Sequence, residues 1–213
     1  MMHAFDFTKT TNEALLKHGI LEDVIQEADF KPWGVLAGEF SSDSPIAMGN
    51  TLSAKDAQSR PTVQFNLNPE EGAPRVSDKD LFTLVITDPD APSRSDHKWS
   101  EFCHYIEADI KILDQTATAT SGKVSEPQFV CSKLNSGTEL VSYHGPAPPK
   151  GTGKHRYVLL LYKQPAGVVS SKFTEVKDRP NWGYGTPATG VKKWASENNL
   201  KPIAANFFLV ENK

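Results

Sequence analysis

The sequence has few of the features that hold a small secreted scaffold together or place a chain in a membrane. Only two cysteines, Cys103 and Cys131, occur among its 213 residues. Both lie in apolar runs, which favours small buried side chains over a disulfide framework. No apolar run approaches the about 20 residues that a spanning helix needs, and residues 1–7 lack the basic and long apolar regions of a secretory signal. These absences predict a cytosolic protein.

An excess of positive charge is also absent. Lys and Arg total 23 against 26 for Asp and Glu, so the formal net charge is −3. Non-specific nucleic-acid binding needs an electropositive surface, and the composition therefore argues against a nucleic-acid partner.

The common catalytic and cofactor motifs are missing as well. There is no Gly-x-Ser-x-Gly, Cys-x-x-Cys or His-Glu-x-x-His. Gly153-Lys154 does not form a phosphate-binding loop, because His155 stands where Ser or Thr is required. Gly183–Ala188 matches a dinucleotide string but does not follow a strand pattern. We therefore expect neither a cofactor nor an enzyme.

What the sequence does contain is a series of short strand patterns. Seven segments are rich in β-branched and aromatic residues and are bounded by Gly, Pro, Asn, Asp or Ser. They are Gly34–Phe40, Thr62–Leu67, Leu81–Thr87, Phe102–Ile110, Glu139–Tyr143, Arg156–Lys163 and Ala204–Val210. So many strands with so few helices predict a mainly antiparallel β protein with helices at its edges.

Helical patterns occur only near the two ends of the chain. A capping box of Thr10 and Glu13 predicts a first helix that Gly19 ends. A second short helix is expected over residues 21–26. A third is expected over residues 189–199, where apolar side chains recur at helical spacing.

The most distinctive segment is Asp88-Pro89-Asp90-Ala91-Pro92, directly after an apolar strand pattern. Proline fixes φ and removes a backbone donor, so the strand must end here in a stiff turn. Rigid loops with polar groups at the end of a sheet commonly form binding sites. The alternative is that Asp88 and Asp90 only cap the turn by bonding their own backbone.

Two other segments lie at the ends of predicted strands and share this polar character: residues 99–104 and residues 143–157. Together the three segments offer carboxylates, histidines, aromatic rings and the amides of a Gly/Pro loop. Backbone amides bind anions, a histidine beside a carboxylate stays protonated, and aromatic rings attract ammonium groups. The combination suits a small anionic or zwitterionic head group.

Less specific readings of the same side chains stay open. His18, His97 and His144 each fit an ordinary satisfied core histidine. Asp88, His97 and His104 form an alternative metal-ligand set. Asp88, His104 and His155 are also a candidate set for acid–base catalysis, although no nucleophile accompanies them in the sequence.

Asp88–Pro92 and Gly145–Tyr157 together, with His104 between them, resemble the paired signatures of the phosphatidylethanolamine-binding protein family. The resemblance extends over residues 34–210. It implies a large antiparallel sheet packed against a smaller sheet, with peripheral helices at the N-terminus and near the C-terminus. It also implies one domain over residues 1–213, in which 1–30 form an N-terminal tip and helices and 31–213 form the β core.

The resemblance further implies a pocket for an anionic phospholipid or phosphate-like ligand, without a metal. Its expected lining is Asp88, Pro92, Trp99, Phe102, His104, Gly145, Ala147, Pro148, His155 and Tyr157. It also implies cis peptide bonds before Pro92 and Glu101.

Three further stretches, residues 17–25, 97–104 and 178–190, resemble family members that inhibit serine carboxypeptidases. The implied mechanism is insertion of the N-terminal segment into the active site of the protease. The residues of that segment are Met1, Met2, His3, Ala4 and Phe5. N-terminal acetylation would remove the α-amino charge and make the insertion less costly.

A second function from the same resemblance is a lipid- or anion-responsive signalling module that binds a Ras-regulating or kinase-pathway protein. In either case we expect a monomer in the cytoplasm, with vacuolar or membrane association.

Overall fold

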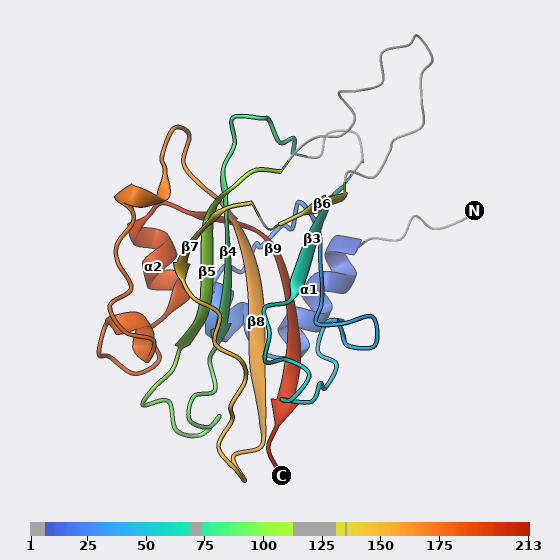
Figure 1. The fold of residues 1–213 in the computed structure, drawn as a ribbon, viewed down its shortest axis with the longest axis vertical. Coiled ribbons are helices and arrows are strands. Elements are labelled where there is room, and N and C mark those ends of the chain that lie inside the picture. The colour runs from blue at the N-terminus through green and yellow to red at the C-terminus, as the bar shows by residue number, and fades with distance from the viewer. Residues whose placement is uncertain (1–6, 69–73, 113–130, 135) are drawn as a thin grey trace, which may run out of the picture.

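The computed structural model describes residues 7–68, 74–112, 131–134 and 136–213 (Figure 1). The expected inhibitory residues 1–5 lie outside the described residues, as does most of the Thr/Ser-rich segment that follows Ile112.

The described strands form two antiparallel sheets, as predicted. The smaller sheet has the order β2-β1-β3-β6, with β1 Gly34–Glu39, β2 Pro45–Ile46, β3 Thr62–Leu67 and β6 Cys131–Lys133. The larger sheet has the order β7-β5-β4-β8-β9, with β4 Phe82–Asp88, β5 Phe102–Ile110, β7 Thr138–Val141, β8 Lys154–Lys163 and β9 Lys201–Glu211.

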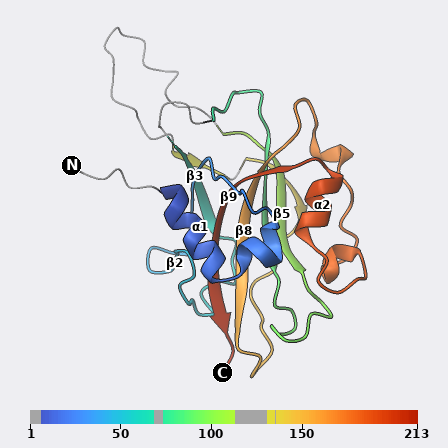
Figure 2. The ribbon, with the colours of Figure 1, turned by 180° about the vertical axis from the view of Figure 1, so that it is seen from behind.

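Both faces of the large sheet are covered. Side chains alternate along a strand, so Tyr157 and Leu159 of β8 pack toward the small sheet while Val158 and Leu160 pack toward the helices. Figure 2 shows α1 and α2 in front of the large sheet on the face away from the small sheet. This double coverage explains why β4 is buried at every position and why β8 reads as apolar on both faces.

Asn206 of β9 joins the two sheets. Its Nδ2 donates to the carbonyl oxygens of Leu36 (2.8 Å) and Ile46 (3.0 Å), and its Oδ1 accepts from the amide of Met48 (2.9 Å). Because buried polar groups are costly unless bonded, this satisfied amide fixes how the small sheet sits on the large one.

The helices are α1 Phe7–Lys17, a π-helical turn η1 Leu21–Ile25, 3₁₀ turns η3 Ser170–Lys172 and η4 Asn181–Gly183, and α2 Val191–Glu197. The predicted capping box is wrong, because α1 begins at Phe7 and Thr10 lies inside it. Contacts distant in sequence help to hold this helix, including a hydrogen bond from Asn12 Nδ2 to the carbonyl of Phe30 (2.8 Å). Gly19 follows the helix with φ +70°, as a helix-ending glycine should.

Two short strands, β2 and β6, were not predicted, because two- and three-residue strands carry no usable periodicity. β9 begins at Lys201, three residues before the predicted start. Proline normally interrupts a ladder, but Pro202 lies on an edge strand at a register shift opposite Tyr162. Cys103 is buried and free, as expected, and burial raises the pKa of its thiol to about 12.

Candidate functional site

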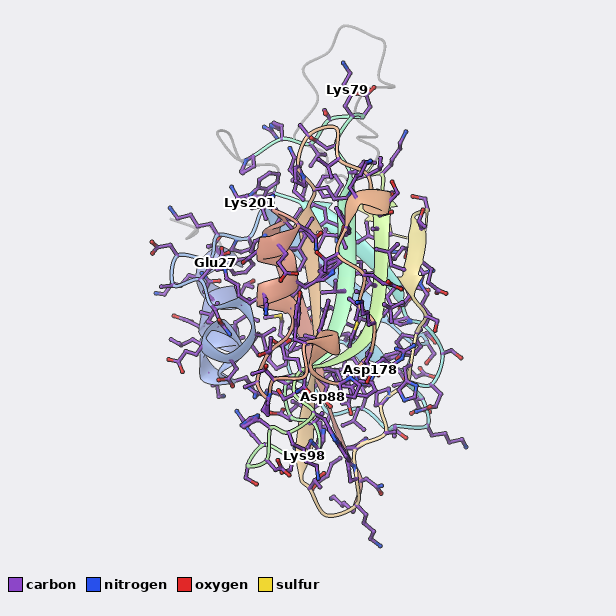
Figure 3. The ribbon with its side chains drawn as sticks, turned by 90° about the vertical axis from the view of Figure 1, so that its left-hand side faces the viewer. Glu27, Lys79, Asp88, Lys98, Asp178 and Lys201 are labelled. Carbon is purple, nitrogen blue, oxygen red and sulfur yellow. The ribbon has the colours of Figure 1, made fainter. Side chains whose placement is uncertain are left out.

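A cavity of about 150 Å³ lies at one end of the large sheet, where β4 and β8 meet the turn after β4. Figure 3 shows Asp88 at the lower end of the strands, with Lys98 below it. The cavity is lined by Asp88, Ala91, Pro92, Trp99, Phe102, His104, His144, Ala147, Pro148, Pro149, His155 and Tyr157. All the predicted pocket residues except Gly145 are in this lining, which adds Ala91, His144 and Pro149.

Gly145 lies beside the cavity. A Cβ at this position would come 2.6 Å from Gln58 Oε1, so only glycine lets the loop approach Gln58 so closely. Gln58 Nε2 in turn donates to the carbonyl of Pro146 (2.9 Å). Gly145 therefore shapes the loop that carries Ala147 and Pro148.

The two loops at the mouth are tied to each other. The peptide bonds Ala91–Pro92 and Ser100–Glu101 are both cis, which confirms that expectation. Ser100 Oγ donates to the carbonyl of Pro89 (2.6 Å). Asn181 Nδ2 donates to the carbonyl of Ser100 (2.7 Å). These bonds fix the backbone that presents Trp99.

Asp88 and His155 form a buried pair at the base of the cavity. Asp88 Oδ2 lies 2.9 Å from His155 Nδ1, and His155 Nε2 lies 2.9 Å from Thr152 Oγ1. The single hydroxyl proton of Thr152 is donated to the carbonyl of Pro149 (2.7 Å). Thr152 Oγ1 must therefore accept from Nε2, which assigns a proton to that ring nitrogen of His155.

Both ring nitrogens of His155 are bonded within the protein, so this side chain has no free donor for a ligand. Burial raises the pKa of Asp88, and the hydrogen bond from His155 opposes that rise. Asp88 Oδ1 also accepts the amide of Asp90 (2.7 Å), so the predicted turn-capping role is present beside the pocket role.

His104 is neutral and keeps one nitrogen open. Its Nδ1 lies 2.6 Å from the carbonyl of His144, which can only accept, so the proton is on Nδ1. Burial lowers the pKa of His104 to about 3, against a smaller opposing contribution from this hydrogen bond. Nε2 is therefore an acceptor, and no group of the described residues donates to it.

Aromatic rings enclose the upper part of the cavity. Phe102 lies 4.8 Å from the His104 ring and 5.7 Å from the His144 ring, and Tyr157 meets His104 edge-on at 5.1 Å. Trp99 is 46% exposed at the mouth, with Lys98 Nζ 4.6 Å from its ring centre. The mouth is thus aromatic, and the charge of Lys98 is shared with Asp96, whose Oδ2 lies 3.9 Å from Nζ.

The alternative that His18, His97 and His144 are satisfied core histidines is contradicted by their exposure. His97 and His144 are exposed, and His18 is half-buried against Phe207, with the ring centres 4.9 Å apart. Sequence patterns failed here because all three lie outside regular strands, where periodicity does not report burial. Within the described residues, no three His, Cys, Asp or Glu side chains cluster closely enough to hold a metal ion.

Sequence reasoning missed Arg156 completely. It lies in the predicted strand between His155 and Tyr157, on the face away from the cavity, and it pairs with Asp90. Strand alternation was the available signal, since an arginine flanked by two pocket residues must face the other side.

Glu101 lies buried behind the mouth. Its Oε2 accepts from Thr87 Oγ1 (2.8 Å), which in turn accepts from Trp182 Nε1 (3.0 Å) and lies 3.3 Å from the carbonyl of Phe102. Burial raises the pKa of Glu101 from 4.5 to about 8.

Glu101→Gln is expected to remove a pH dependence of stability. In the wild type the unfolded chain loses this proton near pH 4.5 and the folded chain near pH 8, so stability falls between these values by up to about 1.4 kcal/mol per pH unit. Glutamine keeps an oxygen that can accept from Thr87 but does not titrate. Urea unfolding at pH 5, 6.5 and 8 should show a smaller slope for Glu101→Gln and an unchanged slope for exposed Glu175→Gln. Equal slopes in all three proteins would contradict the prediction.

The comparisons with known proteins agree with this geometry. The family model for phosphatidylethanolamine-binding protein matches residues 38–208. The chain belongs to the phosphatidylethanolamine-binding protein family.

Within the described residues, no helix is both long and apolar enough to cross a membrane.

Two relatives in Saccharomyces cerevisiae extend the family match. The carboxypeptidase Y inhibitor is 55% identical, with 100% of both chains covered. An uncharacterized protein is 40% identical over 93% of this chain and 92% of its own. The chain is thus a full-length homologue of a carboxypeptidase inhibitor.

Solved structures of the family show the same fold. The carboxypeptidase Y inhibitor, in a crystal structure with its cognate proteinase, superposes with a TM-score of 0.89 at 55% identity and 100% coverage of both chains. The phosphatidylethanolamine-binding protein of Plasmodium vivax gives a TM-score of 0.64 at 19% identity, covering 94% of this chain and 97% of its own. At that identity the second match supports the fold alone.

Proposed function

We propose that the protein inhibits a serine carboxypeptidase of the carboxypeptidase Y type by inserting Met1–Phe5 into the protease active site. The supporting observation is the full-length similarity to an inhibitor whose complex with its proteinase has been solved. In sequence, this short apolar segment is separated from α1, which begins at Phe7, by Asp6 alone. Acetylation of Met1 removes a charge that would be costly to bury in the protease pocket.

The cavity is a second, separate site that binds a phosphate-like group, such as an anionic phospholipid head group. Trp99 and Lys98 at the mouth suit an interfacial or zwitterionic ligand, and the open Nε2 of His104 is a polar atom available to it. Asp88, Pro92, Phe102, His104, Ala147, Pro148 and Tyr157 complete the proposed lining, with Gly145 shaping its loop.

The deciding experiment is titration of carboxypeptidase Y with the N-acetylated chain and with a chain lacking residues 1–5. We expect stoichiometric inhibition by the full chain and a loss of at least about 100-fold in affinity on deletion, equivalent to roughly 2.7 kcal/mol. Binding of inorganic phosphate by the shortened chain is the folding control. Inhibition that survives the deletion would refute the insertion mechanism.

The second candidate is a lipid- or anion-responsive signalling module acting on a Ras-regulating or kinase-pathway protein. The observation that favours this signalling role is the exposed Trp99 at the mouth of the cavity. Failure of both chains to inhibit any serine carboxypeptidase, together with retained phosphate binding, would favour this candidate.

A catalytic role is not proposed. Both nitrogens of His155 are occupied, and within the described residues no serine or cysteine side chain is hydrogen-bonded to His104. We place the protein in the cytoplasm as a monomeric single domain, with vacuolar or membrane association through its partners.

A further inference from the structure

Strand β8 carries two buried acid–base pairs on opposite faces. His155 and Tyr157 line the cavity, while Arg156 between them projects to the helical face. The carboxylates of both pairs come from one short turn: Asp88 pairs with His155, and Asp90 pairs with Arg156.

Arg156 connects that turn with the N-terminal helices. Its side chain is only 1% exposed. Nε and Nη2 donate to the two oxygens of Asp90 at 2.8 and 2.7 Å, as a fork. Nη1 donates to the carbonyl of His18 and to Asp23 Oδ2, each at 2.7 Å.

The turn between α1 and η1 rests directly on this guanidinium. A Cβ added at Gly19, whose φ is +70°, would lie 3.2 Å from both Arg156 Nη1 and Asp23 Oδ2. Arg94 Nη2 lies 3.4 Å from the same His18 carbonyl. The turn between α1 and η1 is therefore held by the buried guanidinium of Arg156, whose partner Asp23 is half exposed.

The path from the cavity to this point is short and continuous. Asp88 lies against the cavity and receives the amide of Asp90 on Oδ1 (2.7 Å). Asp90 Oδ2 receives both the amide of Arg156 (2.9 Å) and its Nε. An anion beside Asp88 and His155 therefore changes the electrostatic potential at the turn that carries Asp90. The effect is strengthened by the low local dielectric, and Asp90 is the carboxylate that binds Arg156.

We propose that Arg156 energetically couples the pocket to the N-terminal helices, so that a phosphate-like ligand and the docking of α1 and η1 influence each other. Arg156 is a positioning residue in this scheme and touches neither ligand nor protease. The inference rests on the proposed pocket ligand and on the inhibitory role of the segment that α1 carries. Coupling of this kind is reciprocal, so a change on the helical side must alter the pocket.

The test removes the charge of the Asp23 carboxylate, which pairs with Arg156, by the substitution Asp23→Asn. The matched control is Glu22→Gln, which changes an exposed residue on the same helical turn. Amide exchange needs no ligand. In Asp23→Asn the amides of Asp90 and Arg156 should exchange at least about fivefold faster, while those of central β4 stay unchanged. Purely structural damage would accelerate all of them together.

Two functional measurements follow on the same variants. The affinity for inorganic phosphate should change by about fivefold or more in Asp23→Asn and stay constant in Glu22→Gln. Saturating phosphate should alter the inhibition constant of the wild type and leave that of Asp23→Asn unaltered. Unchanged exchange at Asp90 and Arg156, or a phosphate affinity equal to that of the wild type, overturns the coupling.

Different results would refute the two proposed functions. A wild type that does not inhibit the protease refutes the inhibitor assignment, and one that binds no phosphate refutes the pocket ligand. In either case the exchange measurement still shows whether Asp23 is coupled to the turn that carries Asp88 and Asp90.

Discussion

Arg156→Leu is expected to lower the free energy of unfolding by about 4 kcal/mol, because removing one partner of a buried ion pair leaves an uncompensated charge. Asp90 is fully buried and would lose both forked bonds. The carbonyl of His18 and one oxygen of Asp23 would each lose a donor as well. Urea unfolding at pH 7 measures the effect.

The double variant Asp90→Asn/Arg156→Leu should recover part of this loss, since the stranded carboxylate is then neutral. The exposed substitution Lys55→Leu serves as a control and should stay within about 0.5 kcal/mol of the wild type. A single variant as stable as the control would show that the pair contributes little to the fold.

The affinity for a phosphodiester such as glycerophosphoethanolamine should fall about tenfold for each unit of pH between 5 and 7. His104 is neutral in the free protein, with its pKa lowered by burial to about 3, and its open Nε2 can only accept. A phosphodiester also only accepts, so a bond between them requires a proton on Nε2. The proton is bound with the ligand, and raising the pH therefore weakens binding.

Calorimetry in two buffers of different ionisation enthalpy would count that proton directly. His104→Gln supplies an amide donor that does not titrate, so its affinity should be independent of pH. His144→Gln changes the neighbouring imidazole, whose pKa is lowered by partial desolvation and by the charge of Arg179, and should keep the wild-type slope. A wild-type affinity that is constant from pH 5 to 7, with no proton taken up, would contradict the role given to His104.

The sequence predicted the sheets well because their signals are local. Alternating or continuous apolar runs bounded by Gly, Pro and Asp located most of the strands, and β3 and β5 match their predicted ranges. The predictions that were wrong concern residues whose local preference is overridden by contacts distant in sequence. Thr10 resembles a helix cap, yet α1 begins at Phe7, and Pro202 looked like a strand boundary, yet it lies within β9.

The loops around the cavity were also predictable, because an Asp-Pro turn after a buried strand and a Gly/Pro loop before another are visible in the chain itself. By itself the sequence determined the strand content, the lack of an obvious catalytic motif and the three segments that meet at the pocket, while the resemblance to the family supplied the individual lining residues. Only the tertiary structure decided which carboxylate serves which base. Asp88 meets His155 and Asp90 meets Arg156 across 67 and 66 positions of sequence. Those partners are set by the register between β4 and β8 and by strand alternation, and both exist only once the sheet has formed.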